Sequence, residues 1–188
     1  MKLLALSQCT LFKMGIEGVF SSLEQTDKNF IIIDIENLPD INGYYPYLGN
    51  LDIIFVYKNP LDLYLFNQIL IDSIMCKFRV CFILKKSPIK HFYNLLSDKG
   101  HHRRIQYVFH NYLSIKENKV MDLYSQDKTA LQVSTALGIT LSCFSTTKRS
   151  IMSKLQVKSD CLLYQKVLMR KNVNNLLFHL LNQSNTSN

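Results

Sequence analysis

Short apolar runs alternate with stretches of helical periodicity through the first half of the chain. The runs are rich in Ile, Val, Leu and Phe, and none is longer than an ordinary β-strand. Between the first two runs, apolar residues recur at spacings of four, three and four from Phe12 to Leu23, which places them on one face of a helix. This alternation is typical of βαβ units, which build a parallel sheet. We therefore predict strands at 3–6, 30–34, 51–57 and 78–84, helices at 10–24, 61–76 and 89–96, a loop at 38–50, and one further strand at 105–109.

The composition favours a folded protein without a membrane anchor. The chain has 188 residues, of which 47% are hydrophobic and 19% charged, enough to build one large or two small domains. No apolar run approaches the roughly 20 residues of a membrane helix, and the run Leu3–Leu6 is shorter than the h-region of about 7 to 15 residues in a secretory signal. The cysteines lack the spacing of a zinc site or a disulfide framework. We expect no membrane partner, no metal site, and reduced thiols in the cytoplasm.

Positive charge is concentrated in the C-terminal part. Residues 1–111 carry 12 basic and 10 acidic side chains, whereas residues 112–188 carry 10 basic and 4 acidic ones. Between Lys128 and Ser159 there is no Asp or Glu. A uniformly positive surface is the usual footprint of a nucleic-acid partner. A second basic stretch, over 77–104, has the simpler explanation of a solvated face and a linker.

The C-terminal part also carries the signals of three consecutive helices. Ser114 and Glu117 form a capping box, which predicts the start of a helix. A second helix over 130–137 stops at Gly138, which can adopt the left-handed conformation of a tight turn. Thr140 can then cap a third helix. This third helix directs Phe144, Ile151 and Leu155 inward and leaves Ser145, Thr146, Lys148, Arg149 and Ser153 on a small, hydroxyl-rich and basic outer face.

This outer face suits the major groove of double-stranded DNA. Short hydroxyl side chains let the backbone approach, the N-terminus of the helix favours a phosphate, and Arg149 can pair with guanine through two hydrogen bonds. A generic helical packing module is the alternative interpretation of the same spacing.

Residues 113–159 resemble the LuxR/FixJ-type DNA-binding domain. The matching segments are Leu113-Ser114-x-x-Glu117, Val120-Met121, Val133-Ser134-x-x-Leu137-Gly138-Ile139-Thr140, Cys143-Phe144 and Ile151-Met152-Ser153-Lys154-Leu155-x-Val157-x-Ser159. The stretch 145–155 is most similar to the RcsB/RcsA group of enterobacterial regulators. Asp127 departs from the pattern, because it replaces the Gly that is common after the first helix; Asp can adopt the left-handed conformation. Ser145 and Thr147 replace the usual Lys and the common His.

The resemblance implies a recognition helix over 142–155 and a fourth helix over 160–168. It places Ser145, Thr146 and Arg149 toward base edges, places Thr140, Ser142, Lys148 and Lys154 near phosphates, and includes Thr147 among the DNA-binding positions. Members of the family commonly dimerise through the fourth helix, where Cys161, Tyr164 and Leu168 are left for a partner. Packing of both faces of this helix into the core is the alternative. The tail at 176–181 is expected to form a short apolar helix.

The N-terminal half resembles, in its architecture, the receiver domain of bacterial response regulators. Receiver chemistry needs two carboxylates after the first strand to hold Mg²⁺ and an Asp after the third to accept the phosphoryl group. Here Ser7 and Gln8 occupy the first place, and Tyr57, Lys58 and Asn59 the second. Loop solvation accounts for Asp34, Glu36 and Asp40. We therefore predict a truncated receiver-like domain that has no phosphoacceptor.

The sequence as a whole predicts a DNA-binding transcription regulator that is not an enzyme. The fold class is a degenerate α/β receiver-like domain at 1–100, a linker or last strand at 101–111, an all-α helix-turn-helix domain at 112–170, and a helical tail at 171–188. No phosphate loop, nucleophile elbow or catalytic carboxylate pair is present in the sequence, and no cofactor is expected. The expected partners are double-stranded DNA and a second copy or another LuxR-type regulator. The alternative is an interaction protein that modulates another such regulator with little DNA contact.

Overall fold

The computed structural model describes residues 2–23, 29–39, 51–97 and 113–185. The strands are β1 (Lys2–Leu6), β2 (Asn29–Asp34), β3 (Leu51–Tyr57) and β4 (Arg79–Leu84). The helices are α1 (Thr10–Ser21), the 3₁₀ helix η1 (Pro60–Leu65), α2 (Gln68–Lys77), α3 (Ile89–Leu96), α4 (Ile115–Tyr124), α5 (Ala130–Leu137), α6 (Leu141–Lys154) and α7 (Asp160–Asn185). The prediction at 105–109 and the predicted linker lie outside the described residues.

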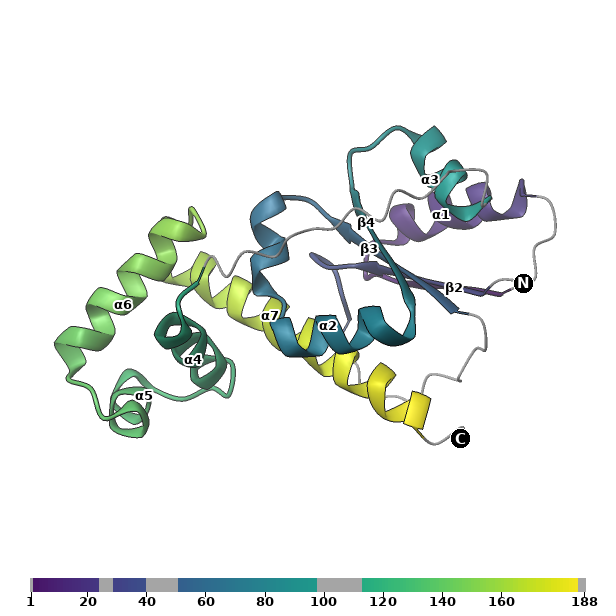
Figure 1. Cartoon of the computed structure of the whole chain (residues 1–188). Helices are drawn as coiled ribbons and strands as arrows, with labels where there is room; N and C mark the ends of the chain where they lie inside the picture. The colour runs from purple at the N-terminus through teal and green to yellow at the C-terminus, as the bar shows by residue number, and fades with distance from the viewer. Residues whose placement is uncertain (1, 24–28, 40–50, 98–112, 186–188) are drawn as a thin grey trace.

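All four strands are parallel, which confirms the predicted α/β class. Helices α1 and α3 pack on one face of the sheet, and α2 and the C-terminal half of α7 pack on the other (Figure 1). Both faces of β2 and β3 are therefore covered. This explains why these strands read as continuous apolar runs instead of alternating polar and apolar residues.

The strands lie in the order β1-β2-β3-β4, with β1 at the edge. Flavodoxin-like domains have the order 2-1-3-4-5 instead. The steps from β1 to β2 and from β3 to β4 run in the same direction across the sheet, yet α1 and α2, which make these connections, lie on opposite faces. The two crossovers therefore have opposite handedness, and one of them is of the rare left-handed kind.

The helix predicted over 61–76 is two helices, which corrects that prediction. Phe66 ends η1 in an extended conformation, with ψ of 140°. Asn59 caps η1 by accepting from the amide of Leu61 at 3.0 Å, and Asn67 caps α2 by accepting from the amide of Ile69 at 3.0 Å. An asparagine cap that begins a second helix competes with continuation of the first, and periodicity alone did not reveal it.

A single helix, α7, replaces the predicted fourth helix and separate short tail helix. Its N-terminal half contributes Leu163 and Val167 to the core of the helical unit. Its C-terminal half contributes Val173, Leu176, Leu177 and Leu180 to the core beneath the sheet. No Gly or Pro interrupts residues 160–185, so the helix continues through the predicted boundary at 170. One element thus belongs to both cores.

The two cores also meet through η1. Leu65, at the end of η1, is fully buried in the core of the helical unit. The ammonium of Lys166 on α7 forms an ion pair with Asp62 of η1, whose side chain is 2% exposed. The amide of Asn67 donates to the side chain of Asn174 at 3.0 Å.

Among the described residues, no helix is long and apolar enough to cross a membrane.

Candidate nucleic-acid interface

Local capping sets the start of each helix in the helix-turn-helix segment. Thr129 caps α5 and, together with Gln132, forms a capping box. Thr140 caps α6, with its hydroxyl oxygen accepting from the amide of Cys143 at 3.1 Å. Ser114 and Glu117 form the predicted capping box at the start of α4. The predicted helix starts are confirmed.

Left-handed residues shape the turns between these helices. Gly138 ends α5 with φ of 62°, and the amide of Ile139 donates back to the carbonyl of Ser134 at 3.0 Å, which closes the turn into α6. Asp127 has φ of 59° after α4, which is the left-handed conformation predicted for this residue. The turns on either side of α5 are therefore set by residues within the turns themselves.

The inner face of α6 is held by an apolar core and by one buried carboxylate. Phe144, Ile151 and Leu155 are buried, as predicted. Glu117 is also buried; its Oε1 accepts from the hydroxyl of Ser150 at 2.7 Å and its Oε2 from the ammonium of Lys154 at 2.6 Å. The same carboxylate accepts from the amide of Ser114 at 2.6 Å. One side chain therefore joins the start of α4 to the C-terminal half of α6.

The pKa of Glu117 reflects this environment. Burial is the largest single effect and raises the pKa, but the hydrogen bonds from Lys154, Ser150 and Ser114 together lower it to about 2 from an ordinary value of 4.5. The carboxylate is therefore charged at neutral pH.

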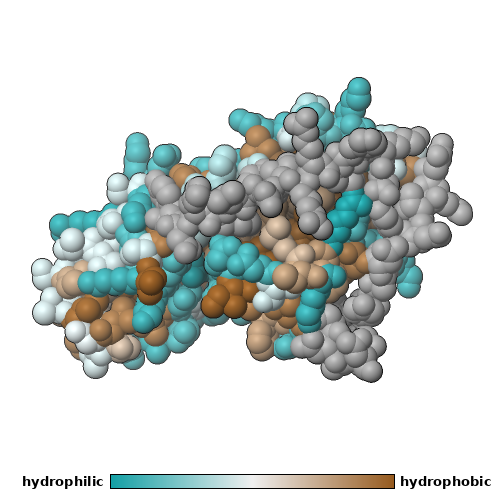
Figure 2. Space-filling model, viewed as in Figure 1, coloured by the Kyte–Doolittle hydropathy of each residue, from teal (hydrophilic) through white to brown (hydrophobic). Residues whose placement is uncertain are grey.

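The outer face of α6 presents small polar side chains and one arginine. Ser142, Ser145, Thr146 and Arg149 are all exposed. Figure 2 shows the α6 side of the molecule, at the left, as mainly pale and teal. The hydroxyl of Thr146 donates to the carbonyl of Ser142 at 3.1 Å, so it lies flat along the helix.

Two predicted lysines are already paired. The ammonium of Lys148 lies 2.6 Å from a carboxylate oxygen of Asp160 at the start of α7. Lys154 is held by Glu117. Thr140 is exposed, although its hydroxyl oxygen is used by the cap. Lys154 therefore supports α6, and Lys148 lies beside the exposed face.

Thr147 is buried, which corrects its assignment to the DNA-binding set. Its side chain is turned toward the core, and its hydroxyl donates to the carbonyl of Cys143 at 2.8 Å. It follows Phe144 by three positions and precedes Ile151 by four, so it shares their inward face. The resemblance to the family had suggested otherwise.

Sequence reasoning missed Lys116. Its ammonium lies 2.8 Å from the sulfur of Cys143, in the first turn of α6. It thereby adds a cation to the N-terminal end of α6, where an anion is favoured. Lys116 lies 27 positions before Cys143 in the sequence, and no local pattern predicts this contact.

The residues predicted to be left for a partner are on the surface of α7. Cys161, Tyr164 and Leu168 are exposed, together with their neighbour Leu162. The hydroxyl of Tyr164 donates to Asp127 at 3.2 Å, and this hydrogen bond is the main cause of a raised tyrosine pKa. These side chains therefore do not pack into the core of the chain.

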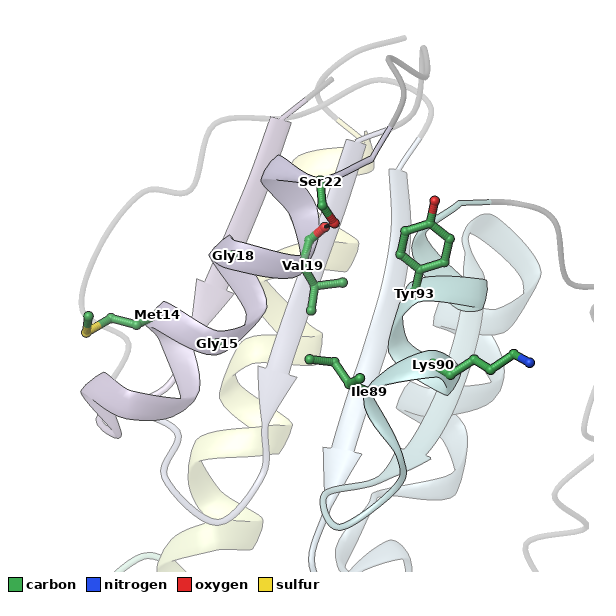
Figure 3. Close-up of a pocket in the computed structure, with 8 residues that line it drawn as sticks. All are labelled: Met14, Gly15, Gly18, Val19, Ser22, Ile89, Lys90 and Tyr93. Atoms are coloured by element: carbon green, nitrogen blue, oxygen red, sulfur yellow. Dashed lines mark hydrogen bonds between the residues drawn. The ribbon is translucent and has the colours of Figure 1, made fainter.

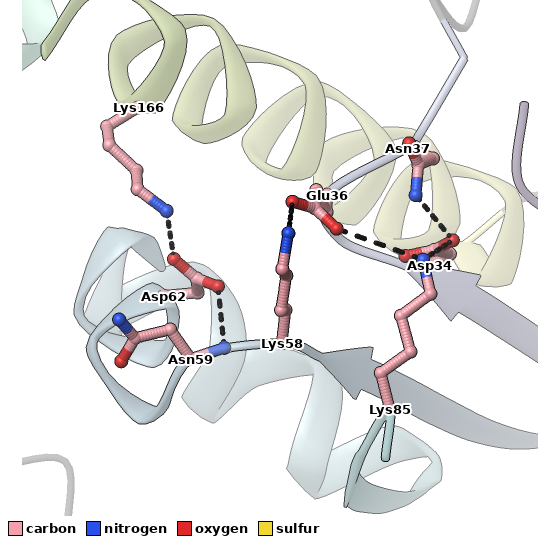
Figure 4. Close-up of polar contacts among 8 residues, drawn as sticks. All are labelled: Asp34, Glu36, Asn37, Lys58, Asn59, Asp62, Lys85 and Lys166. Atoms are coloured by element: carbon pink, nitrogen blue, oxygen red, sulfur yellow. Dashed lines mark hydrogen bonds and ion pairs between the residues drawn. The ribbon is translucent and has the colours of Figure 1, made fainter. Parts of the chain in front are cut away.

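The carboxyl edge of the sheet is built from lysine–carboxylate pairs (Figure 4). Asp34 is fully buried, not loop-solvated as predicted, and its Oδ2 accepts from Lys85 at 2.7 Å, from Ser7 at 2.7 Å and from Asn37 at 3.0 Å. Lys58 pairs with Glu36 at 2.8 Å, and the hydrogen bond to Glu36 is the main cause of its raised pKa.

Asp40 lies outside the described residues. Within the described ranges, no cluster of three His, Cys, Asp or Glu side chains could hold a metal.

Comparison with known proteins places the helical unit in a family. Residues 111–167 match the family described as bacterial regulatory proteins, luxR family. No curated protein matches the chain.

Three solved structures of response regulators, two of RcsB and one of StyR, are similar to the chain. Two RcsB dimers bound to two parallel DNAs give 18% identity over 89% of this chain and 98% of that chain, with a TM-score of 0.41. RcsB from Salmonella enterica serovar Typhimurium bound to promoter rprA is 16% identical in sequence, and the match covers 89% of this chain and 98% of the RcsB chain, with a TM-score of 0.41. The response regulator StyR is 14% identical in sequence, and the match covers 88% of this chain and 97% of the StyR chain, with a TM-score of 0.31.

The capped helices, the left-handed turns and the sequence match all concern the same stretch of chain. Residues 111–167 are therefore a helix-turn-helix domain of the luxR family of bacterial regulatory proteins.

Proposed function

We propose that the chain is a sequence-specific transcription regulator that inserts α6 into the major groove of double-stranded DNA. The observation that carries the proposal is the exposed face of Ser142, Ser145, Thr146 and Arg149 on a helix whose other side is fixed by core packing. Small side chains permit close approach of the helix, and Arg149 can donate two hydrogen bonds to a guanine.

Ser145, Thr146 and Arg149 contact base edges in this proposal, and Thr140, Ser142 and Lys148 contact phosphates. Lys148 would exchange the carboxylate of Asp160 for a phosphate oxygen, since both are anionic oxygen acceptors. Lys154 acts by holding Glu117 and α6 in place. Lys116 is an additional phosphate candidate at the N-terminal end of α6.

The chain binds as a dimer, with a second copy or another LuxR-type regulator, through Cys161, Tyr164 and Leu168 on α7. Their exposure supports this role. Two recognition helices related by a two-fold axis read two half-sites of an operator.

Partner binding, dimerisation or abundance controls the regulator, instead of an aspartyl phosphate at the end of β3. Tyr57, Lys58 and Asn59 follow β3, and none of them can carry such a phosphate. The carboxylate of Asp34, at the end of β2, already forms an ion pair with Lys85. Lys58 pairs in the same way with Glu36, so lysines already neutralise both carboxylates at the carboxyl edge of the sheet.

The test is binding of the full chain to genomic DNA fragments at two salt concentrations. We expect tight binding to a few fragments, weakened by salt, and a loss of roughly 10- to 100-fold in Arg149→Ala, which corresponds to one good base contact. Lys2→Ala is the matched control, because it removes the same charge from the strand at the opposite end of the molecule (Figure 1). Equal binding to all fragments, or none, would instead favour a modulator that acts through another regulator.

A further inference from the structure

A groove runs between α1 and α3 on the sheet face opposite α7. It consists of two adjoining cavities of about 520 and 270 Å³ that share Gly15, Val19 and Ile89. Figure 3 shows Val19 and Ile89 between the two helices, with Met14 and Lys90 extending outward on opposite sides. We call this surface the α1/α3 groove. It lies in the receiver-like unit, away from α6 (Figure 1).

The walls of the α1/α3 groove expose large apolar side chains to an unusual extent. Leu11 is 81% exposed, Met14 is 62% exposed and Ile89 is 68% exposed. A single exposed apolar residue needs no explanation, but three around one groove indicate a surface that another molecule covers.

Two glycines deepen the groove at a cost to α1. Gly15 and Gly18 both line it, and glycine is unfavourable in the middle of a helix. A Cβ at either position would meet nothing within 4 Å, so packing inside this chain does not require glycine there. The missing side chains leave room for a second backbone to approach α1 closely.

The charge of the groove selects among partners. The described residues that line it include Lys85 and Lys90 but no Asp or Glu. Lys85 is neutralised by Asp34 and Glu36, whereas Lys90 forms no ion pair with a residue in the described part of the chain. An occupant with an apolar body and an acidic flank is therefore the complementary one.

We propose that the α1/α3 groove binds an amphipathic helix of a partner protein, with small and apolar residues on its inner face and acidic residues beside Lys90. The lining of α1 from Leu11 to Ser22 is about 16 Å long at 1.5 Å per residue, which is three turns of a docked helix. This surface gives the receiver-like unit a role that does not depend on DNA contact by α6.

The test uses two synthetic helical peptides of about 18 residues with the same Ala and Leu stripe. One carries Glu on its flanks and the other carries Lys. Binding to the full chain is followed by chemical-shift changes in NMR spectra. We expect the Glu peptide to bind at least about tenfold more tightly than the Lys peptide, and its shifts to map to α1 and α3.

Three variants make the result specific. Gly18→Leu fills the groove without meeting other atoms at its Cβ and should reduce binding of the Glu peptide by about tenfold or more. Lys90→Glu should reverse the preference between the peptides. Leu131→Gln, which replaces an exposed leucine on α5, outside the groove, should change nothing. Circular dichroism confirms that each variant is folded.

Three results would overturn the proposal: no binding of either peptide, equal binding of both, or no effect of Gly18→Leu. Self-association of the chain in analytical ultracentrifugation that is abolished by Gly18→Leu would also overturn it, because a second copy would then be the occupant. DNA binding by the Gly18→Leu variant is measured in parallel and should be unchanged, so failure here is distinguishable from failure of the proposed DNA-binding function.

Discussion

The ammonium of Lys154 lies 2.6 Å from a carboxylate oxygen of Glu117, across 37 positions of sequence. Glu117 is at the start of α4 and Lys154 is the last residue of α6, so the pair joins the first helix of the helix-turn-helix unit to the helix proposed to read DNA. Replacing Glu117 with Gln should keep the cap on the Ser114 amide and remove only the charge.

We expect Glu117→Gln to lower the free energy of unfolding by about 3 kcal/mol at neutral pH, because the pKa of about 2 lies well below the ordinary 4.5. A carboxyl group whose pKa is lower in the folded state than in the unfolded state stabilises the folded state at pH values above its unfolded pKa. This contribution is lost as the pH falls from 4.5 toward 2. Urea denaturation at pH 7 and at pH 3.5 measures the effect, and the gap between wild type and variant should narrow at the lower pH. Glu17→Gln, on the exposed side of α1, is the control. An unchanged gap would show that the carboxylate is not held by these contacts.

Asp160→Asn should strengthen DNA binding. Asp160 neutralises Lys148 beside the outer face of α6, so its replacement frees a cation for a phosphate. The slope of log affinity against log salt should become steeper by about one unit, and the loss of a favourable charge at the start of α7 should cost only about 0.5 kcal/mol. Asp72→Asn, which makes the same charge change on the exposed side of α2, should leave the slope unaltered. A slope that steepens equally in both variants would reflect net charge alone.

Lys166→Met should destabilise the junction between the two cores. The substitution removes the cation that pairs with Asp62, whose side chain is 2% exposed, and leaves this buried carboxylate without its partner. We expect the free energy of unfolding to fall by about 3 kcal/mol. The double variant Asp62→Asn/Lys166→Met should recover part of that loss, because no uncompensated buried charge remains. Denaturant unfolding of the two single variants and the double variant forms the cycle. Lys158→Met, at an exposed position before α7, should stay within about 0.5 kcal/mol of wild type.

Hydrogen exchange should show that β1 is an edge strand. Its residues pair only with β2 among the described strands, so its amides should exchange roughly tenfold or more faster than those of β2 and β3. Cross-strand NOEs should connect Ile31 directly with Ile53, which are partners in the β2–β3 ladder. Slow exchange throughout β1 together with NOEs from β1 to β3 would instead indicate the flavodoxin-like order.

Several features of the protein were predictable from local sequence. The four strands predicted within 3–84, the caps at Ser114 and Thr140 and the left-handed turn at Gly138 all agree with the structure. Each depends on residues within one or two turns of each other, where side-chain spacing and backbone preference act directly. Asp127 belongs to this group, since its φ of 59° follows from the tolerance of Asp for the left-handed region.

Contacts between distant segments were decided by the tertiary structure. The periodicity of α6 did not distinguish an exposed Thr147 from a buried one, because burial depends on which helices cover that face. In the same way, only the fold brings Lys116 to Cys143 and Lys85 to Asp34.

The sequence by itself determined that the chain has a parallel sheet followed by a helix-turn-helix unit, since both are encoded in short-range patterns. The tertiary structure decided the order of the strands and the continuity of α7 through both cores. Val173, Leu176 and Leu180 lie on one helical face in the sequence. Only the sheet against which they pack makes this segment a continuation of the last helix of the helix-turn-helix unit. The physical reason is that apolar burial is non-directional, so a sequence specifies that a face must be covered without specifying what covers it.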